Sequence, residues 1–170
     1  FRSYNYPALA TAGIHIKYEY DKIRKVDPNI PMHPHYVFNT NVLVLTIFPG
    51  IQESLVRTVL NTPGLKAVVL KTYGSGNAPQ KPWFIKLLAE ATQKGIVIVN
   101  ISQCQTGMVE MGRYETGLHL LDAGVISGYD ATVESVLTKL MFLLGHDLSP
   151  KEIRMEMEHS LAGEITKPGV

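Results

Sequence analysis

Four short runs of apolar, mostly β-branched residues recur along the sequence and limit the folds open to it. They occupy residues 42–47, 67–70, 96–99 and 124–128. The stretches between them carry apolar residues at every third or fourth position, which is the spacing of one helical face. Continuous apolar strands that alternate with helices through short connections build parallel sheets with right-handed crossovers. The sequence therefore predicts an α/β domain, a four-stranded parallel sheet with helices on both faces.

The helices between and after these strands are expected at 51–60, 79–94, 111–123, 132–144 and 149–159. The last begins with Ser149, Pro150 and Glu152, which is the pattern of a capping box with proline at the first helical position. Residues 1–41 differ, because they contain four prolines and only one short alternating apolar stretch, at 13–16. We predict a linker with one edge strand there.

Composition excludes several classes of function. Charged residues make up 18% of the 170-residue chain and its formal net charge is +1, so nothing favours nucleic acid or an anionic membrane as partner. The single cysteine, Cys104, excludes an intramolecular disulfide framework and fits a reducing compartment. No apolar run approaches the roughly 20 residues of a membrane span, and we expect a cytoplasmic protein. Because the sequence starts at Phe1 without methionine, we expect it to belong to a longer chain.

The most distinctive polar segment follows the second apolar run and contains two glycines. It is Lys71, Thr72, Tyr73, Gly74, Ser75, Gly76 and Asn77. Open α/β sheets bind ligands beyond the carboxyl ends of their strands, so this loop and those near 48 and 102–107 should share one edge. An ordinary strand-to-helix turn is the alternative for such a short motif.

Known catalytic motifs are missing. The sequence has no G-x-S-x-G, H-E-x-x-H or Walker A segment, and Pro79 takes the third glycine position of a dinucleotide fingerprint. His33-Pro34-His35 has no carboxylate or cysteine nearby to complete a metal site, so we expect no metal or cofactor. A Cys104 and His119 dyad has no local group to activate the thiol. From the residues alone we predict a small-ligand or subunit-contact domain.

A resemblance extends this prediction. The chain resembles the C-terminal domain of a type I, cytoplasmic-type bacterial L-asparaginase in the segments 71–79, 100–104, 107–117, 124–128 and 161–166. Residues 6–9 and 12–16 are similar to the stretch that joins the two domains of that family. The resemblance implies a flavodoxin-like or Rossmann-like α/β domain at 42–170. Residues 1–41 would be the interdomain linker and the end of an N-terminal domain.

The resemblance also implies a reaction, the hydrolysis of L-asparagine to L-aspartate and ammonia. Family members carry the threonine nucleophile, in a T-G-G-T-type motif, on the N-terminal domain, and this motif is absent here. The chain alone is therefore expected to be inactive and to complete the active site of a neighbouring subunit in a homodimer or homotetramer. Tyr114 would reach the neighbour's nucleophile and Asn77 would approach its substrate.

Some members of that family also bind asparagine at a regulatory site. The positions that would form it here are Lys71, Thr72, Tyr73, Gly74, Ser75, Gly76, Ser102 and Cys104. Lys71 stands where those members have arginine, and Ser102 where they have threonine. A lysine supplies a point charge in place of a planar fork matched to a carboxylate, which weakens the expectation of regulation. Two alternatives stay open: a free-standing amino-acid-binding or subunit-contact module, and the corresponding domain of an archaeal glutamine-dependent tRNA amidotransferase subunit.

Overall fold

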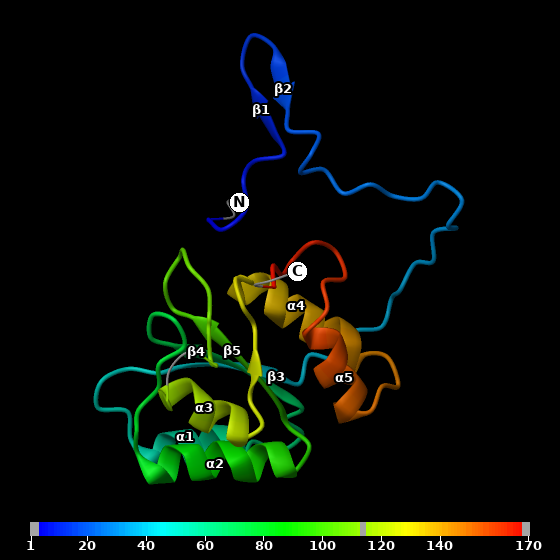
Figure 1. Ribbon diagram of the computed structural model, residues 1–170. Coiled ribbons are helices and arrows are strands. Elements are labelled where there is room, and N and C mark those ends of the chain that lie inside the picture. The colour runs from blue at the N-terminus through cyan, green and yellow to red at the C-terminus, as the bar shows by residue number, and fades with distance from the viewer. Residues whose placement is uncertain (1–3, 113–114, 168–170) are drawn as a thin grey trace.

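A computed structural model describes residues 4–112 and 115–167, and its central feature is a four-stranded parallel sheet (Figure 1). The strands are β3 (Val42–Thr46), β4 (Ala67–Thr72), β5 (Val97–Ser102) and β6 (Ile126–Ser127). They lie side by side in the order β3-β4-β5-β6, and each adjacent pair is parallel. The predicted parallel sheet is confirmed, and its strand order follows the chain without a reversal.

Helices cover both faces of the sheet, as the sequence predicts. The three helices that connect successive strands lie together on one face: α1 (Glu53–Leu60), α2 (Pro82–Gln93) and α3 (Glu115–Asp122). The two helices that follow the last strand cover the other face: α4 (Val133–Leu144) and α5 (Pro150–Met157). Right-handed crossovers between neighbours in a sequentially ordered sheet all fall on the same side, which explains this division.

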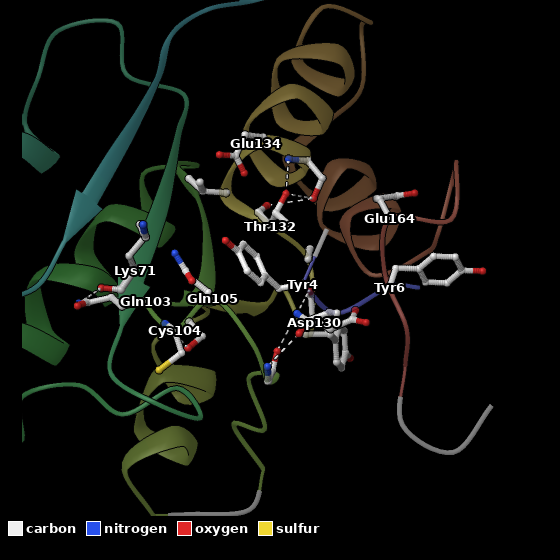
Figure 2. A pocket seen from close by; sticks show the side chains of 17 residues that line it. Tyr4, Tyr6, Lys71, Gln103, Cys104, Gln105, Asp130, Thr132, Glu134 and Glu164 are labelled. Carbon is white, nitrogen blue, oxygen red and sulfur yellow. Dashed lines mark hydrogen bonds between the residues drawn. The ribbon is translucent and has the colours of Figure 1, made fainter. Parts of the chain in front are cut away.

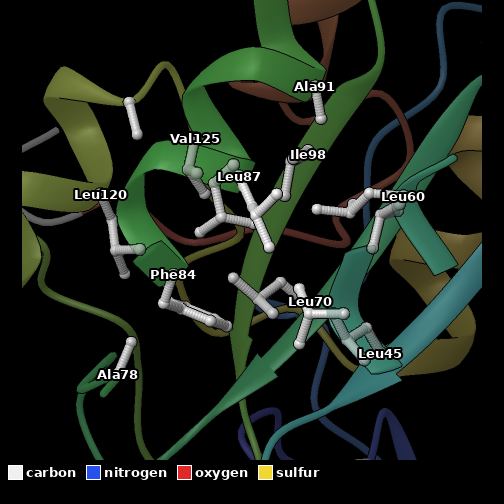
Figure 3. Close-up of a cluster of buried hydrophobic side chains, with 14 of the residues drawn as sticks. Leu45, Leu60, Leu70, Ala78, Phe84, Leu87, Ala91, Ile98, Leu120 and Val125 are labelled. Atoms are coloured by element: carbon white, nitrogen blue, oxygen red, sulfur yellow. The ribbon is translucent and has the colours of Figure 1, made fainter. Parts of the chain in front are cut away.

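Side chains of the central strands alternate between two cores. Val68, Leu70 and Ile98 pack beneath α1, α2 and α3 around Phe84 (Figure 3). The second core, beneath α4 and α5, includes Ala67, Val69, Val97, Val99, Val136, Leu140, Ile153 and Met157. Residues 67–70 are fully buried, as expected of a central strand covered on both faces. Burial of each such aliphatic side chain stabilises the fold by about 1.5–3 kcal/mol.

The helix ends agree with their local sequence signals in most cases. Ser149 and Glu152 form the predicted capping box, and the Thr132 hydroxyl accepts a hydrogen bond from the Ser135 N–H at 3.3 Å. The predicted start of the third helix at Met111 is wrong. Met111 lies in a turn whose backbone packs so closely on Gly117 that a Cβ there would stand 2.2 Å from the Met111 carbonyl oxygen.

The N-terminal region contains two strands where the sequence predicted one. β1 (Ala10–Ala12) and β2 (Ile16–Tyr18) form an antiparallel hairpin, so the predicted edge strand at 13–16 spans the turn and the start of β2. Residues 19–41 form no helix or strand and run toward α4. There the Asn39 N–H donates to the Met141 carbonyl at 2.9 Å, and His35 Nδ1 lies 2.8 Å from His146 Nε2.

The helices of the described part of the chain run for twelve residues at most, α2 and α4 being the longest. Within 4–112 and 115–167, none has the length and apolar character that a membrane span requires.

Candidate functional site

The glycine loop at the end of β4 forms a closed miniature hairpin. The Tyr73 N–H donates to the Asn77 carbonyl at 2.9 Å, and the Asn77 N–H donates to the Tyr73 carbonyl at 2.8 Å. Gly74 and Gly76 both have positive φ values, +50° and +112°. A Cβ on Gly76 would also lie 2.8 Å from Val109 Cγ1. Both positions therefore need a residue that adopts positive φ readily, and Gly76 also has no room for a Cβ. An ordinary strand-to-helix turn does not impose these two conditions.

A buried polar pair supports this loop from below. The Thr72 hydroxyl donates to Asn100 Oδ1 at 2.7 Å, and Asn100 Nδ2 lies 3.5 Å from the Gly76 carbonyl oxygen. Both side chains are fully buried. Thr72, a predicted contact residue of the regulatory site, is therefore a support beneath the loop. Leaving either buried group without its partner would cost about 1–3 kcal/mol.

A cleft of about 770 Å³ opens at the carboxyl edge of the sheet, where the sequence placed the site (Figure 2). Among the predicted site residues, Lys71, Ser102 and Cys104 line it. The other predicted residues of the glycine loop, 72–77, do not line the cleft. Asn77 is exposed elsewhere on the surface. Tyr114 lies outside the described residues. The structure thus separates Lys71, Ser102 and Cys104 from the other predicted regulatory positions, 72–76, which share the glycine loop with Asn77.

Side-chain hydrogen bonds hold the cleft floor in place. The Ser102 hydroxyl donates to the Gly74 carbonyl at 2.6 Å and accepts from the Cys104 N–H at 3.0 Å. Gln103 Nε2 donates to the carbonyls of Ile47 and Lys71, at 2.7 and 3.0 Å. This one amide ties the ends of two neighbouring strands together. Sequence reasoning missed Gln103, although its position directly after a strand was a usable signal.

The opposite wall comes from segments that the sequence did not associate with a site. They are residues 4–6, the loop 129–132 with the first turn of α4 at 133–135, and Glu164. Figure 2 shows the Tyr4 ring projecting into the cleft, between the wall that carries Lys71 and the wall that carries Thr132. Tyr129 has a φ of +51°, an uncommon backbone conformation for a bulky residue. Burial, and to a smaller extent the Glu158 carboxylate, raise the pKa of the Tyr129 phenol, so this hydroxyl stays protonated.

Charges of both signs surround the cleft. Lys71 supplies an ammonium group, and Asp130, Glu134 and Glu164 supply carboxylates. Burial raises the pKa of Glu164, but N–H groups of Leu161 and Ala162 and the Lys139 ammonium outweigh it and lower the pKa to about 2. Because Lys139 Nζ lies 2.7 Å from Glu164, this charge is already paired. A ligand with separate positive and negative groups suits such a lining.

Within the described residues, neither a Cys104–His119 dyad nor a cluster of metal ligands is formed. Cys104 lines the cleft, whereas His119 Nδ1 lies 3.3 Å from Gln80 Oε1 on another part of the surface. Within 4–112 and 115–167, no group of three His, Cys, Asp or Glu side chains is placed to hold a metal ion.

The fold and the cleft define an α/β domain with a cleft, bordered by charged side chains, at the carboxyl edge of a parallel sheet. Residues 41–157 match the family described as the Glutaminase/Asparaginase C-terminal domain, and the chain belongs to this family.

Individual relatives agree with this assignment. L-asparaginase 1 of Escherichia coli (strain K12) is 44% identical over 98% of this chain and 48% of its own length. A 60 kDa lysophospholipase of Homo sapiens is 41% identical over 100% of this chain and 30% of its own length. The crystal structure of L-asparaginase I from Vibrio cholerae superposes with a TM-score of 0.90 at 40% identity, covering 96% of this chain and 49% of that one. The chain thus spans about half the length of these two L-asparaginases and 30% of the human relative.

Proposed function

We propose that residues 1–170 form the C-terminal part of an L-asparaginase, which hydrolyses L-asparagine to L-aspartate and ammonia. The carrying observation is that 98% of the chain aligns at 44% identity with 48% of an L-asparaginase. No T-G-G-T-type motif occurs in the sequence. The nucleophile would therefore come from an N-terminal catalytic domain, with residues 1–41 as the linker and 42–170 as the accessory domain.

The accessory domain would act on a neighbouring subunit in a cytoplasmic homodimer or homotetramer. Asn77 is exposed on a loop that its two backbone hydrogen bonds to Tyr73 close, which favours a role in a contact between subunits. Tyr114 would supply its hydroxyl to the neighbour's nucleophile, because a phenol can donate a hydrogen bond or relay a proton. Asn77 does not line the cleft described above.

The cleft itself would hold an amino-acid effector. Its charges of both signs support this role, since an α-amino acid carries an ammonium and a carboxylate. Lys71 would bind the carboxylate, and Asp130 or Glu134 would face the ammonium. Lys71→Met should then weaken effector binding about tenfold or more, whereas Lys71→Arg should retain or strengthen it. Isothermal calorimetry with L-asparagine measures both effects, and equal affinities of Lys71→Met and wild type would contradict the assignment.

Ammonia release is the direct test of the activity. The full gene product that contains residues 1–170 should release ammonia from L-asparagine, and residues 1–170 alone should not. Tyr114→Phe should lower kcat by about 10²-fold or more, the range of a lost proton-transfer group. Tyr20→Phe is the matched control, because Tyr20 is 73% exposed on the linker. Absence of ammonia release from the full gene product would refute the proposed activity. Full activity of Tyr114→Phe would refute only the role of that tyrosine.

Two other substrates separate the competing functions. The human relative is named a lysophospholipase, so lysophosphatidylcholine belongs in the assay. Because the alignment that supports the proposed activity is to an L-asparaginase at 44% identity, we expect asparagine to be the better substrate. L-glutamine tests the amidotransferase-like alternative, which a preference for glutamine over asparagine would support.

A further inference from the structure

The side chain of Asn5 joins three segments that are far apart in the sequence. Asn5 Nδ2 donates to the Gly107 carbonyl at 2.9 Å and to the Asp130 carbonyl at 2.8 Å. Its Oδ1 accepts from the Gly107 N–H at 3.0 Å. Both amide hydrogens and the carbonyl oxygen are therefore engaged. The bonds reach across 102 and 125 residues of sequence, so they are not a local turn.

The chemistry of these bonds requires a carboxamide. A donor and an acceptor in one plane match both backbone groups of Gly107, as an adjacent strand would, and the second amide hydrogen serves Asp130. An aspartate at position 5 would have the same size, but its carboxylate can only accept hydrogen bonds and would face the carbonyl oxygens of Gly107 and Asp130 without a donor. Gly107 has a φ of +101°, a conformation that favours glycine. The partner of Asn5 is thus shaped for this pairing.

All three segments border the cleft. Asn5 itself, Gly107 and Asp130 are among its lining residues. Asp130 is held from another side as well, because its Oδ1 accepts from the Thr166 N–H at 2.6 Å. A ligand in the cleft would contact the loops that Asn5 holds together. Any ligand that orders those loops would also order the N-terminal segment.

We propose that Asn5 is a positioning residue that couples occupancy of the cleft to the placement of the N-terminal segment. Thermodynamic linkage makes the coupling reciprocal: fixing residues 4–6 strengthens ligand binding, and ligand binding fixes residues 4–6. Only the chemical class of the ligand, an α-amino acid, rests on the proposed function. The structural role of Asn5 does not depend on that identity.

Hydrogen exchange tests the structural role in the full gene product that contains residues 1–170. Asn5→Ala should speed amide exchange in peptides covering 103–107 about tenfold or more, since the three hydrogen bonds to Gly107 and Asp130 are lost together. Asn5→Asp should speed it further, because a carboxylate faces two carbonyl oxygens. Asn29→Ala is the matched control, since the Asn29 side-chain amide donates to Oδ1 of neighbouring Asp27, at 3.0 Å, and bridges no distant segments. Exchange in Asn5→Ala equal to that in Asn29→Ala would overturn the proposal, as would retained protection in Asn5→Asp.

Calorimetry with L-asparagine on residues 1–170, which are expected not to hydrolyse it, tests the coupling. Asn5→Ala should bind about tenfold more weakly than wild type, and Asn29→Ala should match wild type. Equal affinity of Asn5→Ala and wild type would overturn the coupling. Absence of binding by wild type would contradict the effector role of the cleft, and the exchange experiment would still decide the role of Asn5.

Discussion

A buried ion pair between α4 and the C-terminal tail allows a quantitative test of the packing. Lys139 and Glu164 lie 2.7 Å apart, with side chains only 5% and 13% exposed. Lys139 Nζ also donates to the His159 carbonyl, and the Glu164 carboxylate accepts from the N–H groups of Leu161 and Ala162. Removing one charge would leave the other in a poorly solvated position.

The expected magnitude follows from that geometry. Removing one partner of a buried pair costs about 3–5 kcal/mol. We expect the lower end, about 3 kcal/mol, for Lys139→Met, because Glu164 keeps two N–H donors and some contact with water. Glu164→Met should cost a similar amount. The double variant should lie within about 1 kcal/mol of wild type, since an apolar pair of similar volume replaces the charges without an orphaned ion.

Urea unfolding of the 170-residue chain measures these changes. Circular dichroism and the fluorescence of Trp83, the single tryptophan, should give coincident transitions if unfolding is two-state. The m value should stay constant. Arg57→Met is the matched control, because the Arg57–Glu53 pair is 52% and 43% exposed, and its loss should cost less than about 1 kcal/mol. A double variant that loses the sum of both single losses would refute the reasoning.

Three further predictions concern acid stability and the glycine loop. The folded-state pKa of Glu164 is about 2, against an ordinary 4.5. Its ionised carboxylate therefore stabilises the fold above about pH 4.5, and this stabilisation is lost as pH falls toward 2. Between pH 5 and pH 3, urea unfolding should show a larger fall in the free energy of unfolding for wild type than for Glu164→Met. Gly76→Ala should destabilise by about 1–3 kcal/mol in the same assay, since it combines a positive φ with a Cβ 2.8 Å from Val109. Thr72→Val should cost about 1–3 kcal/mol by leaving Asn100 Oδ1 without its donor, and an unchanged midpoint would contradict the buried role of this pair.

The sheet and its helix ends were predictable because their signals are local. Residues 67–70 read as a buried strand since every side chain is apolar, and all four are fully buried. The capping box at Ser149 needs only residues three positions apart. The sequence predicted one edge strand where the structure has the β1–β2 hairpin. Its six strand residues are all exposed. Without a buried face, no period of two is imposed on the sequence.

The cleft was predictable only in part. Parallel topology brings Lys71, Ser102 and Cys104 to one edge of the sheet, where all three line the cleft. The opposite wall depends on where residues 4–6 dock, and the hydrogen bonds of Asn5 across 102 and 125 residues there follow from no periodicity of the sequence. The burial of Lys139 was also invisible in sequence, because its ionic partner is 25 positions away at Glu164. Long-range polar contacts of this kind carry no local pattern.

The division of helices between the two faces has a consequence during synthesis. α1, α2 and α3 emerge between the strands, so the face they cover can close as the sheet grows. The opposite face, with Val69, Val97 and Val99, has no cover until residues 133–157 leave the ribosome. A nascent chain paused before that point would display an apolar sheet surface open to chaperones or to self-association. Translation speed between β6 and α5 should therefore govern the yield of folded protein.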